Sequence, residues 1–253
     1  MDFTTEINEL SKLKKPPQKL YYKGDLSLIK KTKIAIVGSR KCSKYTKNLI
    51  ISLANTLKNY DICVVSGAAI GSDIYAHEAA FPNTIAVFGN GLDQIYPAQN
   101  AKMIQQIYSN ALALSEYEPN FKATAWSFLE RNRIVVGLSK ALIIAQADLK
   151  SGSMASAKIA LNLGVPIFVL PQRIGESNGT NELLKSKKAN LITDFDEFAS
   201  IFGDKQISQK DEILEFISQN SDFEKCFEKF GDRLYEYELD GKIAIDGVFV
   251  RVL

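Results

Sequence analysis

Short apolar runs, rich in β-branched residues, alternate with longer segments through the middle of the chain. They predict six strands and a possible seventh, at Lys33–Gly38, Asp61–Gly67, Thr84–Gly89, Ala111–Glu116, Ala141–Gln146, Pro166–Pro171 and Ala189–Thr193. Strands that are apolar almost throughout are buried on both faces, as in a parallel sheet.

The segments between these runs have helical spacing. Leu49, Leu53 and Leu57, for example, recur every four residues and share one helix face. Repetition of strand, helix and strand predicts an α/β fold with a doubly wound, mostly parallel sheet and right-handed crossovers.

We expect three regions: an N-terminal extension at 1–32, a sheet domain at 33–203 and a small C-terminal domain at 204–253. In the extension, Lys19–Lys23 predicts an edge strand. In the C-terminal region, three short helices and a hairpin predict a miniature winged helix, with helices at Asp211–Gln219, Phe223–Phe230 and Arg233–Leu239, strands at Gly241–Ile245 and Val248–Val252, and a turn at Asp246–Gly247.

Composition narrows the class of protein. The chain has 253 residues and a formal net charge of +2, with no apolar run of the roughly 20 residues that a membrane span needs. Its three cysteines lack CxxC spacing, which favours a reducing cytoplasm over a disulfide framework or a zinc site. The single histidine, His77, excludes a multi-histidine metal centre.

The small net charge conceals an asymmetry. Residues 1–203 hold 24 Lys and Arg against 17 Asp and Glu, a net +7, whereas residues 204–253 hold 7 against 12, a net −5. A basic body attracts polyanions and an acidic tail resists them.

Small, polar, glycine-bearing loops follow four of the predicted strands. In a doubly wound sheet, the carboxyl ends of the strands form the ligand-binding edge. Backbone N–H groups at helix starts bind anions there, so the four loops together indicate a phosphate-rich ligand. The loops are Gly38-Ser39-Arg40 with Ser43, Ser66–Asp73, Gly89–Leu92 and Lys150–Ser153.

Two familiar phosphate motifs are absent. The stretch Gly152–Lys158 lacks the second glycine of a Walker loop and the Ser or Thr after lysine, which disfavours ATP hydrolysis. The loop Gly38–Ser43 has one glycine, with an arginine where a dinucleotide would need close backbone approach, which disfavours NAD. Arg40 at a strand tip instead suits bidentate phosphate binding.

The segment Trp126–Arg133 adds aromatic and basic groups. Such groups beside phosphate-binding loops are typical of single-stranded nucleic-acid grooves, where bases stack and cations follow the backbone. The alternative is structural, with Trp126 and Phe128 in the core and the arginines paired with Glu116 or Glu130. We favour the core for Trp126 and leave Phe128 open.

The loops in order resemble the DprA/Smf family of DNA-processing proteins. The resemblance spans roughly residues 19–203 and rests on GSRKCSKY, SGAAIGSDIYAH, GNGLDQIYPAQN, SEY, FLERNRIVVGLSKALIIAQA, KSGSMASA and GTNELL. It implies an extended Rossmann fold, commonly a homodimer, that binds incoming single-stranded DNA in natural transformation and helps load RecA recombinase. It also implies a protein without catalytic activity, cofactor, metal or membrane partner.

Site residues follow from the same resemblance. Arg40 is expected to be the principal phosphate ligand, Phe128 a base contact, and Arg131 and Arg133 either ligands or braces of the pocket. Lys158 is a further candidate, one turn beyond the Ser-Gly-Ser loop. The rest of the expected DNA site comprises Gly38, Ser39, Ser43, Ser66, Gly67, Ser151, Gly152 and Ser153.

Some positions depart from the family pattern. Ser72 stands where isoleucine is usual, Asn90 where serine is usual and Gln146 where glutamate is usual. Loss of the carboxylate at Gln146 makes the site less negative, which suits DNA and weakens any acid–base role.

An enzyme remains the alternative. Nucleotide phosphoribohydrolases have a similar scaffold and carry a PGGxGTxxE signature. The segment Ser177–Glu182 keeps the Gly-Thr of this signature but lacks the double glycine, and its glutamate comes one position early. Asp73 and His77 also share a helix face, but we expect His77 to pack between helix and sheet.

Overall fold

The computed structural model describes residues 2–3, 7–206 and 211–252. The chain divides into two compact units, residues 1–205 and 206–253, which are described separately. No helix in the described ranges is both long and apolar enough to cross a membrane.

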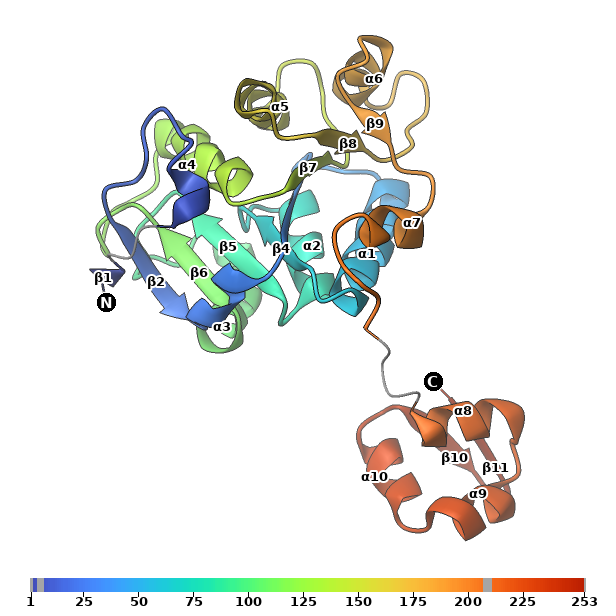
Figure 1. Cartoon of the computed structure of the whole chain (residues 1–253). Coiled ribbons are helices and arrows are strands. Elements are labelled where there is room, and N and C mark those ends of the chain that lie inside the picture. Colours follow the sequence, from blue (N-terminus) through green and yellow to red (C-terminus); the bar gives the residue numbers. More distant parts are fainter. Residues whose placement is uncertain (1, 4–6, 207–210, 253) are drawn as a thin grey trace. The chain divides into compact units, whose positions relative to one another are not determined.

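The larger unit is built on one sheet, in the order β1-β2-β6-β5-β4-β3-β7-β8-β9 (Figure 1). From β6 to β9 every neighbouring pair is parallel, while β2 runs antiparallel to β6 and β1 antiparallel to β2. The doubly wound parallel sheet is therefore confirmed. The strands are β1 Asp2–Phe3, β2 Leu20–Gly24, β3 Lys33–Val37, β4 Cys63–Ser66, β5 Thr84–Phe88, β6 Leu112–Ser115, β7 Ala141–Ile144, β8 Ile167–Val169 and β9 Asn190–Leu191.

Helices cover both faces of this sheet. Alternate residues of β3 enter different cores: Ile34 and Ile36 pack with buried residues of α1, α2 and α7, and Ala35 and Val37 with those of α3, α4 and α5. The helices are α1 Lys44–Asn59, α2 Ser72–Ala80, α3 Ala101–Asn110, α4 Ala125–Gly137, α5 Gly152–Leu163, α6 Asn178–Lys185 and α7 Phe195–Ser200, with 3-10 turns η1 Asn8–Leu10, η2 Leu26–Lys30 and η3 Ala98–Asn100.

The strand order reverses beside β3. The chain runs outward through β3, β4, β5 and β6, then returns to place β7 on the other side of β3. Loops leaving β3 and β7 therefore diverge to opposite faces of the sheet. The crevice between such loops is the usual ligand site of an open α/β sheet.

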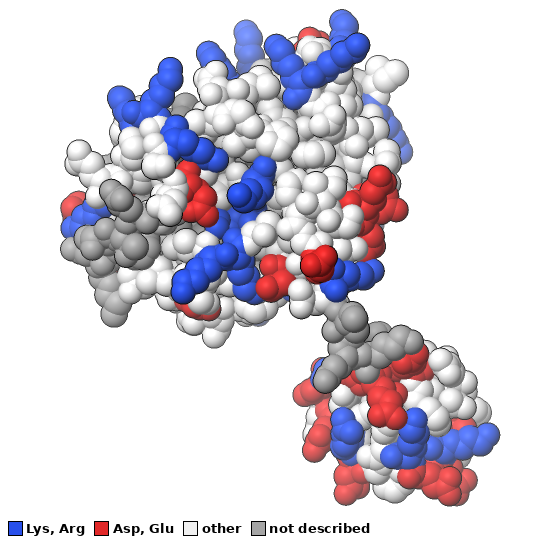
Figure 2. All heavy atoms as spheres, in the orientation of Figure 1, with Lys and Arg blue, Asp and Glu red and all other residues white. Residues whose placement is uncertain are grey.

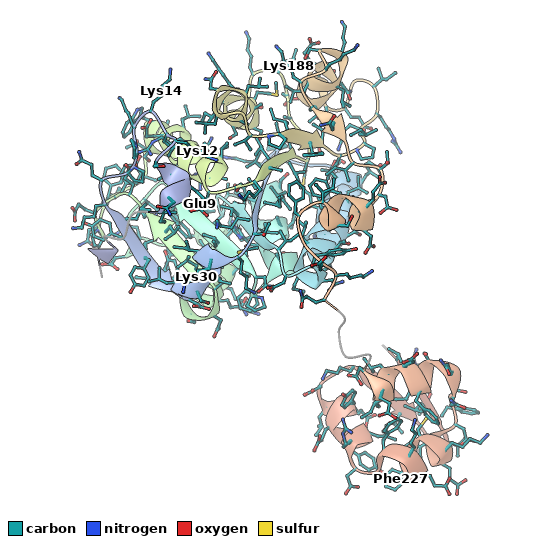
Figure 3. The ribbon with its side chains drawn as sticks, viewed as in Figure 1. Glu9, Lys12, Lys14, Lys30, Lys188 and Phe227 are labelled. Atoms are coloured by element: carbon teal, nitrogen blue, oxygen red, sulfur yellow. The ribbon has the colours of Figure 1, made fainter. Side chains whose placement is uncertain are left out.

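The N-terminal segment belongs to the same unit. β2 adds to the sheet beside β6, and Leu10 and Leu13 are buried against Gly137 of α4. Lys33, at the start of β3, is almost fully buried and forms an ion pair at 3.0 Å with Glu9. Figure 3 labels Glu9 in this N-terminal segment. Burial raises the pKa of Glu9, but the hydrogen bond from Lys33, a backbone hydrogen bond and the charges of Lys33 and Lys140 together lower that pKa overall.

The C-terminal unit contains three helices and a hairpin, the element order of a winged helix. A small core of Ile213, Ile217, Cys226, Leu234, Ile243 and Val250 holds it together. Acidic side chains are spread over its visible face, with basic side chains among them (Figure 2). Its elements are α8 Glu212–Gln219, α9 Phe223–Phe230, α10 Arg233–Leu239, β10 Ile243–Asp246 and β11 Phe249–Val252.

Candidate nucleic-acid interface

A cleft of about 890 Å³ lies at the carboxyl edge of the sheet. It is lined by the loops that follow β3, β4, β5 and β7, and by the first turns of α4 and α5. The small polar loops predicted to share one edge are thus brought together. A smaller pocket adjoins it and shares Arg40, Ala69, Asn90, Tyr96 and Phe128 with the main cleft.

Hydrogen bonds from the first residue of α2 hold the loop after β3 in place. The N–H and hydroxyl of Ser72 both donate to the Ser39 carbonyl oxygen, at 3.1 and 3.0 Å. Gly71 has φ +83°, and a Cβ there would lie 2.5 Å from the Ser39 oxygen and 2.6 Å from the Arg40 oxygen. Ser72, a departure from the family pattern, therefore anchors the loop that carries Arg40, and Gly71 permits the close approach.

Arg40 projects from this loop as an exposed cation. Among the described residues it has no hydrogen-bond or ion-pair partner, and its guanidinium Cζ lies 5.9 Å from the ring centroid of Phe128. Phe128 in turn stacks on Tyr96, with ring centroids 5.6 Å apart and planes inclined by 30°. The arrangement places an unneutralised guanidinium beside two aromatic rings, which suits a phosphate and an adjoining base.

Two helices direct their N-termini at the cleft. Ser151, Gly152 and Ser153 line it at the start of α5, where the Ser151 hydroxyl accepts the Met154 N–H at 3.3 Å. At the start of α4, Thr124 and Ser127 form a reciprocal capping box. Free N–H groups and the positive dipole ends of both helices favour an anion between them.

Arg131 lines the floor of the cleft but is only 5% exposed. Its Nη1 donates to the carbonyl oxygens of Gly67, at 2.7 Å, and of Val87. A Cβ on Gly67 would lie 2.3 Å from Nη2, so glycine is required for this approach. Burial lowers the pKa of Arg131 and raises that of Asp73, and each charge partly offsets the other's shift. Arg131 therefore links the loop after β4 to the end of strand β5.

Four of the predicted site residues lie away from the cleft. The Ser43 hydroxyl caps α1 by accepting the Thr46 N–H, and the Ser66 hydroxyl donates to the Ile36 carbonyl in the core. Arg133 forms ion pairs with Glu116 and Glu130, as the structural alternative predicted. Lys158 is exposed on α5 and does not line the cleft.

Other cleft residues were not predicted from the sequence. Tyr96 and Lys122 line it, both exposed, and Asn132 lines it beside Arg131. The motif GNGLDQIYPAQN already contained Tyr96, but nothing in its spacing indicated that the ring would meet Phe128. The prediction that Trp126 is a core residue is wrong: it is 62% exposed on the first turn of α4.

His77 is fully buried between α2 and the sheet, as expected. Its Nδ1 lies 2.6 Å from the Thr84 hydroxyl, which itself donates to the Val64 carbonyl. Nδ1 must therefore carry the proton, and Nε2 has no partner among the described residues. Burial, with a smaller contribution from the charge of Arg131, lowers the pKa of His77 to about 3.

This burial predicts an acid-sensitive fold. Below the unfolded-state pKa of about 6.5, His77 binds a proton in the unfolded chain but stays neutral in the folded chain. The free energy of unfolding therefore decreases as the pH falls. Between pH 7 and pH 5, the wild type is expected to lose about 2 kcal/mol more unfolding free energy than His77→Asn. Urea unfolding at the two pH values measures both, and equal losses would contradict the assignment.

The segment that resembles a phosphoribohydrolase signature is used structurally: the Gly179 N–H donates to the Ala147 carbonyl, and the Thr180 hydroxyl to Ser177. Of this segment, Ser177, Gly179, Thr180 and Glu182 do not line the cleft. Among the described residues, no three His, Cys, Asp or Glu side chains gather as a metal site.

Comparisons with known proteins agree with this architecture. A DNA processing protein from Streptococcus pneumoniae is 40% identical over 190 residues, covering 73% of this chain and 67% of the relative. Protein Smf of Borreliella burgdorferi is 37% identical over 166 residues, covering 64% of this chain and 53% of the relative. The chain thus spans about half to two thirds of the length of these relatives.

Solved structures give the same result. DNA processing protein A from Helicobacter pylori, described for its single-stranded DNA binding mode, has a TM-score of 0.78 and 46% identity, with 79% of this chain and 94% of that chain covered. The S. pneumoniae structure has a TM-score of 0.73 and 38% identity, covering 78% of this chain and 70% of that one. The model of the DNA recombination-mediator protein A family matches residues 4–203, so the chain belongs to this family of DNA-processing proteins.

Proposed function

We propose that the cleft binds single-stranded DNA without strong sequence preference and without catalysis. The observation that carries this proposal is Arg40, an exposed guanidinium that has no acidic partner in the described ranges and stands over the Phe128 ring. A phosphate at Arg40 would also face the amides of the β3 loop and the N-terminus of α5.

Eight of the sequence-predicted residues serve as contacts in this proposal. The guanidinium and backbone amides hold phosphates, while Phe128 and Tyr96 accept the face of a base. Arg131 acts as a brace, because its donors are already used by main-chain carbonyls. The eight are Gly38, Ser39, Arg40, Gly67, Phe128, Ser151, Gly152 and Ser153.

The relatives support this ligand. The H. pylori protein, 46% identical, is described by its single-stranded DNA binding mode. The family resemblance extends the proposal to a cytoplasmic role in natural transformation, with RecA recombinase and a second copy of this chain as partners. Sedimentation with and without oligonucleotide tests the dimer, and a monomer under both conditions would contradict it. Retention of the protein on immobilised RecA tests the RecA contact, and no retention would contradict that contact.

Salt provides the direct test of phosphate capture. Each captured phosphate releases counterions, so the logarithm of the association constant falls with log salt by about 0.7 per phosphate for single strands. For two phosphates, held at Arg40 and Lys122, a tenfold rise in salt is expected to weaken binding about 25-fold. Fluorescence anisotropy of a labelled oligo-dT measures it.

A duplex of the same length is the control for this titration. A stiff double helix cannot place a base against Phe128 while its phosphate lies at Arg40, so we expect weaker binding of the duplex. Salt-independent binding of the single strand would remove the phosphate mechanism.

A further inference from the structure

The first turn of α4 presents an exposed indole beside the cleft. Trp126 is the one tryptophan in the sequence and is 62% exposed. Leu129, one turn further along the same helix face, is 52% exposed and lines the cleft. Two neighbouring apolar side chains exposed beside a polar cleft make this turn a candidate binding surface.

This indole rests on a rigid support. Its ring meets Tyr117 in a T-shaped contact, with centroids 6.4 Å apart and planes at 74°. Tyr117 is stacked on Phe121 at 4.5 Å and 13°, and its hydroxyl donates to the Ser127 carbonyl at 3.4 Å. Because a T-shaped contact uses the edge of one ring, at least one face of the indole has no aromatic partner. A ring already held in place loses little entropy on binding a planar ligand.

The surface around the indole is continuous with the cleft. Ala125, adjacent in sequence, and Leu129 both line the cleft, and so does Lys122, an exposed lysine four residues before Trp126. A strand whose phosphate is held at Arg40 can therefore leave the cleft past Lys122 and the first turn of α4. Alternation of cations and aromatic rings along a path is the arrangement that holds single-stranded nucleic acid.

We propose that Trp126 stacks on a second nucleobase of the bound strand, beyond the nucleotide at Arg40 and Phe128. This inference rests on the proposed function and extends the DNA site outside the cleft, onto the first turn of α4. Stacking accepts any base, because every base has a π-face, so this contact adds affinity without sequence preference.

The single tryptophan reports on its own contact. Addition of unlabelled oligo-dT to the full-length wild type is expected to quench tryptophan emission, with the same midpoint as a gel shift of that oligonucleotide. A gel shift that saturates while emission stays constant would overturn the inference and leave the proposed function standing. Absence of a gel shift for the wild type would instead overturn the proposed function.

Two substitutions separate stacking from charge. Trp126→Ala is expected to weaken oligo-dT binding five- to tenfold, and Trp126→Phe, which keeps an aromatic face, to stay within threefold of wild type. The salt dependence of Trp126→Ala should run parallel to that of wild type, because no phosphate contact is lost. Leu239→Ala, at an 88% exposed side chain of α10, is the matched control and should bind normally.

Three outcomes would contradict the stacking contact. They are unchanged affinity of Trp126→Ala, equal weakness of the alanine and phenylalanine variants, and emission that changes with protein concentration in the absence of DNA. The last would mean that the indole packs against a second copy of the chain. Urea unfolding of Trp126→Ala verifies that the fold is retained, as expected for an exposed position.

Discussion

Replacing Arg40 with alanine is expected to weaken binding of a single-stranded oligonucleotide at least tenfold, or about 1.4 kcal/mol. The reason is the state of this guanidinium in the free protein: it is exposed, stands over Phe128 and has no acidic partner in the described residues. No internal interaction has to break before it binds a phosphate. A charge-assisted hydrogen bond commonly contributes 1.5–3 kcal/mol, and anisotropy with labelled oligo-dT measures the loss.

Two further arginine variants sharpen this prediction. Arg251→Ala, in β11 of the C-terminal unit, removes the same charge elsewhere and should leave affinity within twofold of wild type. Arg40→Lys keeps the charge but loses the planar fork, so it should bind between wild type and Arg40→Ala. Affinity of Arg40→Ala equal to wild type, with an unchanged unfolding transition, would contradict a phosphate site at this loop.

Replacing Arg131 with alanine is expected to lower the free energy of unfolding by about 3–5 kcal/mol. Its buried guanidinium bonds the carbonyls of Gly67 and Val87, and its charge faces the buried Asp73. The alanine variant leaves two carbonyl acceptors unpaired, removes the positive charge that acts on Asp73 and leaves a void beneath the cleft. Against a typical total stability of 5–15 kcal/mol, this is a large loss, and urea unfolding at pH 7 measures it.

Arg40→Ala is the matched control for stability, because it makes the same chemical change at an exposed position. It should alter unfolding by less than about 0.5 kcal/mol. The two variants are thus expected to differ in kind. Arg40→Ala should lose DNA binding while its fold stays intact, whereas Arg131→Ala should lose stability. An Arg131→Ala protein as stable as wild type would show that the hydrogen bonds from Arg131 to Gly67 and Val87 do not contribute to stability.

The hydrophobic pattern predicted the sheet well. Each expected parallel strand appears within about two residues of its predicted bounds, and Leu53 and Leu57 face the core while Leu49 is half-buried. The predicted helices and hairpin of the C-terminal region are also present. Local signals were sufficient because continuous apolar runs, glycine turns and helix caps each specify their own element.

The candidate site was predicted in outline. Loops at the carboxyl edge follow from strand order, so Ser39, Arg40 and Ser151–Ser153 could be placed near one another from sequence. Arg131 and Arg133, two positions apart in one motif, could not be assigned. The fold buries one under the β4 and β5 loops and pairs the other with Glu116 and Glu130. Sequence spacing says nothing about which carbonyl or carboxylate lies opposite.

Trp126 is a second residue whose environment could not be predicted from the sequence. An indole in a helical segment is more often buried, and composition gave no reason to expect otherwise. The capping box at Thr124 and Ser127 begins α4 so that this position faces water and Phe128, two residues later, faces Tyr96 and Arg40. The local cap fixes where α4 begins, but which of its faces is buried depends on the packing of α4 against the rest of the unit.

By itself, the amino-acid sequence determined the α/β class, the strand and helix positions and the set of glycine- and serine-rich loops, because these depend on periodicity and turn chemistry within a few residues. Only the tertiary structure decided which polar groups remain available to a ligand. Arg40, Tyr96 and Lys122 lie at the cleft surface, while Ser66, Arg131 and Arg133 already bond to other groups of the protein. Whether a donor is free depends on the acceptors that distant strands bring to it.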